Sequence, residues 1–240
     1  MLGLFNRAAP RLILIVLVMF GMVNGVSRLL PNSDVIAYRV YTAQGQALKV
    51  MDVETGVSRT LDDTHGFGIQ WSPNGEYLAA LRFSPNGPQL QLHGFGRPNV
   101  AFAQDACMGG GLPSWSPDGA QMVFHGSQAC SDTMRNIYRW HVPASAVNAP
   151  RSEAITDHMG DDRSPVWSPD GSQIAFLSSG REDSTSNDVY LMDADGANVE
   201  RLTDGQAGIC CLQWSPDSKK LLFTDNRLNA WYVDVETANR

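Results

Sequence analysis

The sequence lacks the motifs that identify the common hydrolases and metalloenzymes. Its 240 residues contain no Gly-x-Ser-x-Gly pentad, the turn that carries the nucleophile of α/β-hydrolases. Histidine is scarce, no two histidines form a His-x-x-x-His pair, and the five are scattered: His65, His93, His125, His141 and His158. These absences argue against hydrolysis. We therefore expect a protein that is not an enzyme and that carries no cofactor.

Positive charge is also in short supply. The chain has 18 lysines and arginines against 25 aspartates and glutamates, which gives a formal net charge of -7 at pH 7 and a pI near 5.1. No basic cluster offsets this balance, although proteins that bind phosphate backbones need one. We therefore expect no nucleic-acid partner.

Sustained helical periodicity is absent after residue 30. The 22 glycines and 13 prolines suit many short strands instead, and the 43% apolar content is enough for a core within one domain. The body of the chain is therefore predicted to be all-β.

One short phrase, Trp-Ser-Pro-Asp/Asn-Gly, recurs along the chain. Each copy is followed by an apolar alternating stretch, and the tryptophans are 44, 52 and 47 residues apart: Trp71, Trp115, Trp167 and Trp214. That period is too long for a leucine-rich solenoid and fits the four-stranded blade of a β-propeller. We expect the tryptophans to pack between neighbouring blades.

The chemistry of the phrase predicts a tight turn. Proline presets φ at the first central position, Asp or Asn bonds locally, and glycine accepts the positive φ that follows. One strand therefore ends at the Trp-Ser pair, and the next begins just past the glycine. In the last copy Ser218 takes the place of glycine, and we expect this to strain the turn without abolishing it.

Each unit continues with a third strand, a hairpin and a fourth strand, as in 187–193, 193–196 and 198–203. A degenerate first copy of the repeat places residues 31–33 at the position of the Pro-Asp-Gly turn. The last unit ends with a third strand at 229–234. The prediction is a β-propeller of four-stranded antiparallel blades, five in number, with an incomplete last blade. The missing outer strand leaves an edge that invites pairing from another segment.

Residues 1–28 are predicted to be a signal peptide or a short membrane anchor. Arg7 and Arg11 precede the apolar stretch Leu12–Val23, and small and polar residues follow it. The stretch is shorter than the ~20 apolar residues of a spanning helix, and no clean Ala-x-Ala site marks cleavage. A buried N-terminal helix is the structural alternative.

The arginines favour an N-terminus that stays in the cytoplasm and a body that lies outside. We therefore expect an N-terminal apolar helix followed by an extracytoplasmic propeller at 29–240. Membrane contact is expected only through the N-terminal segment, if that segment is not cleaved.

The four cysteines are compatible with an oxidising compartment. Cys107 and Cys130 belong to one predicted blade, in loops that emerge on the same face. A disulfide between them would close a loop of 24 residues and stabilise the fold by ~3 kcal/mol; the alternative is two free thiols. A disulfide between the adjacent Cys210 and Cys211 would be strained, so separate burial or another partner is favoured.

Several polar side chains are expected around one mouth of the central channel. They lie in the loops that precede successive innermost strands, which a propeller brings together: His65, Asp105, His158, Asp161 and Asp162. Such a group can bind a transition metal, another cation or a basic partner segment. The alternative is that these are ordinary polar loop residues, and whether a metal binds stays open.

The repeat resembles that of TolB-like β-propellers. The resemblance is carried by 188–196, 201–203, 214–217 and 221–223, and it covers roughly residues 29 to 240. The repeat is also similar to the propellers that cover prolyl oligopeptidase-like peptidases. The resemblance implies a propeller and, for TolB itself, a periplasmic protein that binds partner proteins in an envelope complex. We expect this chain to differ from TolB in having no α/β domain before the propeller.

Three classes of function are compatible with such a fold, because propellers host all of them. We expect a non-catalytic protein-binding scaffold in the cell envelope, with a protein partner on the loop face or in the central mouth. The first alternative is a small-ligand or metal-binding sensor domain that uses the same mouth. The second is a lyase or hydrolase hosted by the propeller.

Overall fold

The protein is described from a computed structural model. The described residues form strands, turns and loops, and they comprise 26–27, 35–42, 45–63, 66–84, 87–101, 107–109, 111–128, 134–143, 152–181, 187–205 and 209–235. Within them, no helix is long and apolar enough to cross a membrane. The predicted N-terminal helix, and almost all of the predicted signal or anchor, lie outside these residues.

The described residues form five consecutive antiparallel sheets, and neighbours in sequence are neighbours within each sheet. The first sheet contains β1 (Val26–Ser27), β2 (Val35–Thr42), β3 (Gly45–Asp52) and β4 (Ser58–Asp62). The second contains β5 (Gly66–Trp71), β6 (Tyr77–Ser84), β7 (Gly87–Gly94) and β8 (Val100–Ala101). The all-β class is therefore confirmed.

The third sheet contains β10 (Ser114–Trp115), β11 (Gln121–Ser127), β12 (Asn136–His141) and β13 (Glu153–Ala154), and β9 (Cys107–Met108) also pairs with β11. The fourth contains β14 (Asp161–Trp167), β15 (Gln173–Ser179), β16 (Asp188–Asp193) and β17 (Glu200–Arg201). The fifth contains β18 (Cys210–Trp214), β19 (Lys220–Thr224) and β20 (Ala230–Asp234).

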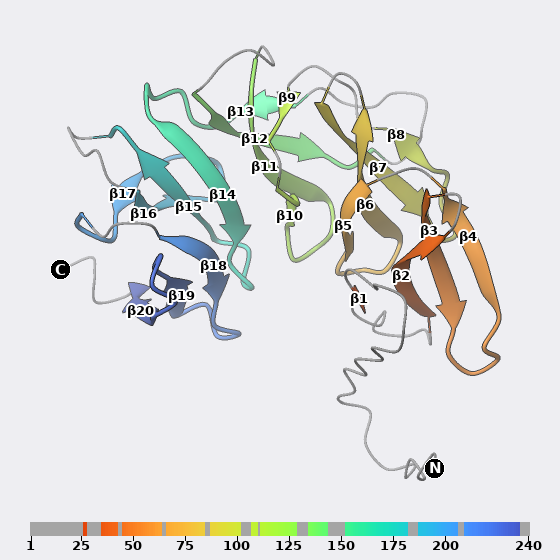
Figure 1. The fold of residues 1–240 in the computed structure, drawn as a ribbon. Helices are drawn as coiled ribbons and strands as arrows, with labels where there is room; N and C mark the ends of the chain where they lie inside the picture. The colour runs from red at the N-terminus through yellow and green to blue at the C-terminus, as the bar shows by residue number, and fades with distance from the viewer. Residues whose placement is uncertain are drawn as a thin grey trace, which may run out of the picture.

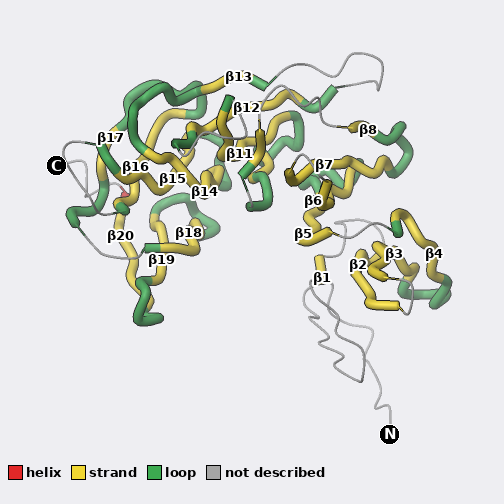
Figure 2. Tube along the Cα trace, turned by 45° about the horizontal axis from the view of Figure 1, so that its top comes forward, coloured by secondary structure: helices red, strands yellow, loops and turns green. Residues whose placement is uncertain are grey.

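The sheets follow one another along a curved path, with the first and fifth sheets at its two ends (Figures 1 and 2). Each sheet contacts the next, through β1 and β5, β7 and β9, β11 and β14, and β14 and β18. This is the sequential blade arrangement that the repeat predicts. The number of blades and the closure of a ring stay predictions.

The core lies between the sheets, because each repeated strand sends alternate side chains to opposite faces. In β15, Ile174 and Phe176 pack against the third sheet, whereas Ala175 and Leu177 pack against the fifth. The four repeated tryptophans are each 5 to 8% exposed and belong to four different clusters between sheets. Their predicted packing role is confirmed.

The repeated turn is held by a serine hydroxyl. Ser168 Oγ donates to Asp170 Oδ1 at 2.7 Å and accepts the Gln173 backbone N–H at 3.0 Å. The other three copies repeat both bonds. Gly171 adopts φ +76° and Ser218, its counterpart in the last copy, adopts φ +60°. The last turn therefore keeps its conformation with a residue that is strained there, as expected.

The innermost strands are interrupted at one repeated position that the sequence analysis did not anticipate. Three residues before the tryptophan, Gly68, Ser164 and Cys211 adopt φ of +64°, +52° and +63°, and the register shifts there in all three sheets. In the third sheet the strand is broken into β9 and β10, which both pair with β11. These bulges redirect side chains at the inner edge of the sheets.

Candidate functional site

The sheets have two ends that differ in chemistry. The turn face is the end that carries the four Trp-Ser-Pro turns, and the loop face is the opposite end, where β12, β14 and β16 begin. The predicted mouth residues belong to the loop face. Of the five, the structure describes only three, which all lie at the start of β14: His158, Asp161 and Asp162. His65 and Asp105 lie outside the described residues.

Asp162 is fully buried and its charge is satisfied inside the protein. Arg181 donates to both carboxylate oxygens, at 2.6 Å through Nη2 and 3.1 Å through Nε. The Ser178 hydroxyl donates to the same carboxylate at 2.5 Å. The Arg181 guanidinium also lies over the Phe176 and Tyr190 rings, 5.5 and 5.6 Å from their centroids. Asp162 therefore anchors the end of the fourth sheet, and its carboxylate is not available to a ligand.

Asp161 is partly exposed and lies between two arginines. Its carboxylate is 3.5 Å from Arg135 Nε and 3.2 Å from Arg163 Nε. Arg163 Nη2 also donates to Asn187 Oδ1 at 2.7 Å, just before β16 begins. His158 is exposed, and its Nδ1 accepts the Gly160 backbone N–H at 3.0 Å. The loop face therefore presents a paired, partly exposed charge cluster made of Arg135, Asp161 and Arg163, here called the loop-face cluster.

His125 lies beside this cluster, and the sequence analysis gave it no role. It belongs to β11, is 8% exposed, and its Nδ1 accepts the Ser164 backbone N–H at 3.4 Å. Burial lowers the pKa of His125 to about 4, and the nearby charges of Arg135 and Arg163 add to that effect while Asp161 opposes it. The imidazole is therefore neutral at physiological pH. A polar residue in an otherwise apolar alternating strand was the one signal that could have pointed to it.

The bulge at Ser164 explains how the His125 ring obtains a hydrogen-bond donor for its Nδ1. Its φ of +52° occurs where β14 shifts register against β15. The Ser164 N–H thereby bonds to the histidine of the neighbouring sheet. On its other side the ring lies against Gly109, where a Cβ would be 2.1 Å from Nε2. The position therefore depends on a tertiary contact between two blades.

The cysteines divide into two kinds. Cys107 is disulfide-bonded. Its expected partner, Cys130, lies outside the described residues, and the pairing of these two stays a prediction. Cys210 and Cys211 are free and exposed, and their sulfur atoms are 2.8 Å apart. The expected separate burial of Cys210 and Cys211 is therefore wrong, because the bulge at Cys211 brings both side chains to the surface.

No group of three or more potential metal-ligating side chains gathers within the described part of the chain. Asp161 and Asp162, two of the predicted ligands, have arginine partners instead. A binding role for the predicted mouth residues stays a hypothesis, and so does the presence of a metal.

Comparisons with known proteins agree with this architecture. The chain is 30% identical over 136 residues to dipeptidyl-peptidase 5 of Porphyromonas gingivalis, which covers 52% of the chain and 19% of the peptidase. The structure is similar to that of TolB from Acinetobacter baumannii, with a TM-score of 0.62 and 17% identity, over 91% of this chain and 53% of that one. It is also similar to an oligogalacturonate lyase in complex with manganese, with a TM-score of 0.64 and 17% identity, over 85% and 60%.

These similarities extend to part of each relative. The chain spans between 16 and 61% of the length of the curated relatives that it matches. Because the sequence identity to each of the two solved structures is only 17%, these similarities establish the fold alone. The sequence profile described as the TolB beta propeller domain matches residues 67–239, which is most of the chain. The chain therefore belongs to the TolB β-propeller domain family.

Proposed function

We propose that this chain is a non-catalytic β-propeller that binds a protein partner in the cell envelope, outside the cytoplasmic membrane. The observation that carries the proposal is the loop-face cluster. The side chains of Arg135, Arg163 and Asp161 are 35, 31 and 22% exposed, so they are accessible and at the same time held by one another. Arginine is enriched at protein interfaces relative to the rest of the surface.

The cluster stands on a rigid base, which favours binding without large ordering costs. Asp162, Ser178 and Arg181 form a buried network directly beneath the start of β14. Two guanidinium groups face one carboxylate in the cluster, so the cluster itself has an excess of positive charge although the whole chain is acidic. An acidic side chain of the partner would complement it.

Two observations support the extracytoplasmic location. The N-terminal sequence has the layout of a secretory segment. The disulfide at Cys107 is of a kind that persists mainly in oxidising compartments. N-terminal sequencing of the exported protein, with protease accessibility of the propeller in intact cells, tests the location and shows whether the segment is cleaved.

The partner is tested by crosslinking in intact cells and purification of the full chain. We expect a stoichiometric protein to be retained by the wild type and by Arg227→Ala, an exposed arginine in the β19–β20 loop. The double variant Arg135→Ala, Arg163→Ala should lose it. Absence of any stoichiometric protein in both detergent and crosslinked samples would contradict the role as a scaffold. Equal retention of the partner by the double variant would show that it binds elsewhere than at the loop-face cluster.

A further inference from the structure

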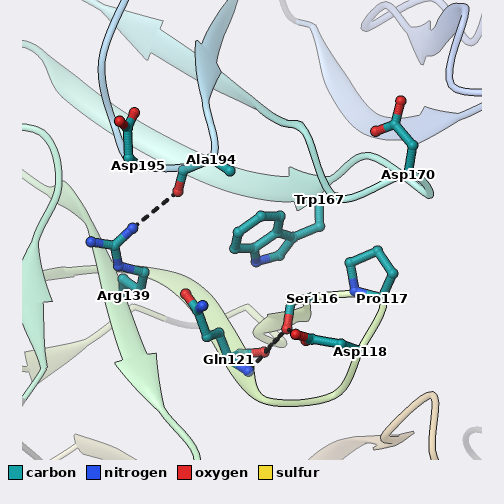
Figure 3. A pocket seen from close by; sticks show the side chains of 10 residues that line it. Ser116, Pro117, Asp118, Gln121, Arg139, Trp167, Asp170, Ala194 and Asp195 are labelled. Carbon is teal, nitrogen blue, oxygen red and sulfur yellow. Dashed lines mark hydrogen bonds between the residues drawn. The ribbon is translucent and has the colours of Figure 1, made fainter.

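A second site lies on the turn face, at the end of the sheets away from the loop-face cluster. A pocket of about 440 Å³ opens between the third and fourth sheets. Figure 3 shows it between the turn of the third sheet, at Ser116 to Asp118, and the hairpin of the fourth, at Ala194 and Asp195. Trp167 forms its wall on the side of the fourth sheet, and Gln121 faces it from the third.

Two buried polar atoms of this pocket have no hydrogen-bond partner among the residues that the structure describes: Trp167 Nε1 and Gln121 Oε1. Trp167 is 8% exposed, and Figure 3 shows the nitrogen edge of its indole turned toward Gln121 and Ser116. A buried polar atom without a partner costs about 1–3 kcal/mol, so most such atoms in native proteins are paired. The lining of this pocket therefore contains one hydrogen-bond donor and one acceptor that are unpaired among the described residues.

The equivalent tryptophan of the next sheet has the partner that Trp167 lacks. Trp214 Nε1 donates to the Val166 carbonyl oxygen, 3.1 Å away in the fourth sheet. Trp214 therefore ties two sheets together through its indole, whereas Trp167 leaves its N–H at the wall of the pocket. Trp115 Nε1 likewise has no hydrogen-bond partner among the described residues, so an unpaired indole N–H is not unique to Trp167. Trp167 differs in that its indole lines this pocket together with Gln121, whose Oε1 is also unpaired.

The rim of the pocket is acidic. Asp118, Asp170 and Asp195 are exposed there. The Ser116 hydroxyl lowers the pKa of Asp118 by donating to it, and Ser168 does the same for Asp170. The one cation of the lining, Arg139, is engaged, since it donates to the Ala194 carbonyl oxygen at 3.0 Å and to Glu153 at 2.6 Å. The rim is therefore suited to a cationic group.

We propose that this pocket binds an extended peptide segment that carries a basic side chain. One peptide group supplies both missing bonds, because its carbonyl oxygen accepts from Trp167 Nε1 and its N–H donates to Gln121 Oε1. A neighbouring lysine or arginine side chain lies against the acidic rim, at Asp118 or Asp170 on one side of Trp167 or at Asp195 on the other (Figure 3). The pocket binds at the turn face, so it is independent of a partner at the loop-face cluster.

The test observes the indole N–H signals of the full chain by NMR, with six tryptophans to resolve. Trp167→Phe identifies the Trp167 signal by its loss. The probes are a pool of blocked pentapeptides of the pattern X-Lys-X-Arg-X and a matched pool with glutamate at both charged positions. We expect the basic pool alone to shift the Trp167 signal, with weaker binding as the salt concentration rises.

Two sets of variants separate the backbone bonds from the charge. Gln121→Met keeps the size of the side chain, removes the acceptor and should weaken binding about tenfold. The triple variant Asp118→Asn, Asp170→Asn, Asp195→Asn retains the oxygen that each turn uses and should remove the preference for the basic pool. Asp217→Asn is the matched control, because Asp217 makes the same turn bonds in the fifth sheet and should change nothing.

Three results would overturn the proposal. They are an unshifted Trp167 signal with both pools, equal shifts with the basic and acidic pools, and unchanged binding by a correctly folded Gln121→Met variant. None of them bears on the loop-face partner, because the experiment uses purified protein and synthetic peptides only.

Discussion

The Trp214 indole nitrogen donates a hydrogen bond to the carbonyl oxygen of Val166, so a side chain of the fifth sheet is bonded to the backbone of the fourth. The contact joins the two sheets by a polar bond inside an apolar cluster that also contains Leu212 and Phe223. Trp167 occupies the same position in its own repeat and has no such bond among the described residues. The repeated tryptophan therefore links two sheets by a hydrogen bond at Trp214 and leaves its indole N–H unpaired at Trp167.

The first prediction compares these two tryptophans. Trp214→Phe and Trp167→Phe remove the same atoms from similarly buried sites, but only the first leaves a backbone carbonyl oxygen without its donor. Trp214→Phe should therefore lower the free energy of unfolding by about 1 kcal/mol more than Trp167→Phe. Urea denaturation of the two variants measures the difference, and equal losses would contradict the assignment of a free donor at Trp167.

The second prediction concerns the buried pair of Asp162 and Arg181. Asp162→Ala leaves a nearly buried guanidinium without its carboxylate and should cost about 3–5 kcal/mol. Asp161→Asn, at the exposed neighbouring position, should cost at most about 1 kcal/mol. Replacing both partners, by Asp162→Leu with Arg181→Met, should recover much of the loss, because no charge is then buried. A mild effect of Asp162→Ala on denaturation would show that Asp162 does not anchor the sheet.

The third prediction is a pH dependence of stability through His125. Its folded pKa of about 4 lies below the unfolded value of about 6.5, so between these values the unfolded chain binds more protons. The stabilisation is complete above pH 6.5 and is lost as the pH falls toward 4, by about 3 kcal/mol. Denaturation at several pH values measures it.

The control for this pH dependence is His125→Gln. Burial also lowers the pKa of His93, so the wild type alone cannot assign the effect to His125. The difference between wild type and His125→Gln isolates the contribution of the one residue. A difference that does not vary between pH 4 and 6.5 would show that His125 is not buried as a neutral imidazole.

The fourth prediction uses the last turn, where Ser218 adopts φ +60°. Ser218→Gly should be more stable than Ser218→Ala by about 1 kcal/mol, because glycine alone adopts this φ without steric cost while both variants lose the hydroxyl. The reverse change, Gly171→Ser, should cost about 1 kcal/mol. The nearest atom to its new Cβ is 3.5 Å away, so the cost would come from the backbone alone. Thermal or urea denaturation tests all three.

The fifth prediction is the disulfide of Cys107 with Cys130. Mass spectrometry of the unreduced digest should find one crosslinked peptide that contains both residues. Reduction, or Cys130→Ser, should lower the free energy of unfolding by about 3 kcal/mol for a loop of this length. A crosslink from Cys107 to any other cysteine, or stability that reduction leaves unchanged, would contradict this pairing.

Much of the architecture followed from local chemistry. The Trp-Ser-Pro-Asp/Asn-Gly motif predicts the turn because its residues act locally. In the structure the Ser168 hydroxyl bonds to Asp170 and to a backbone N–H, and Gly171 adopts the positive φ. The spacing of the phrase predicts consecutive antiparallel sheets. Even the strained Ser218 could be expected, since φ at that position depends on the turn and not on distant residues.

The candidate site was less predictable, because it depends on pairs that are distant in sequence. Asp162 had the sequence features of a mouth ligand, yet its partner Arg181 is 19 residues away and buries the charge. His125 and Ser164 are 39 residues apart, and they meet because a bulge turns the Ser164 N–H toward the neighbouring sheet. Neither pairing is visible in the order of residues.

The sequence by itself therefore determined the repeated turns, the strand alternation and the β-propeller family, because each of these depends on interactions within one repeat. The tertiary structure decided which polar groups are satisfied inside the protein and which are exposed at its surface. Among the described residues it left the Trp167 indole N–H unpaired and gave that of Trp214 an acceptor, although the two tryptophans stand in the same repeated motif. The physical reason is that burial and pairing between sheets depend on the exact distance between two backbones, which no local pattern specifies.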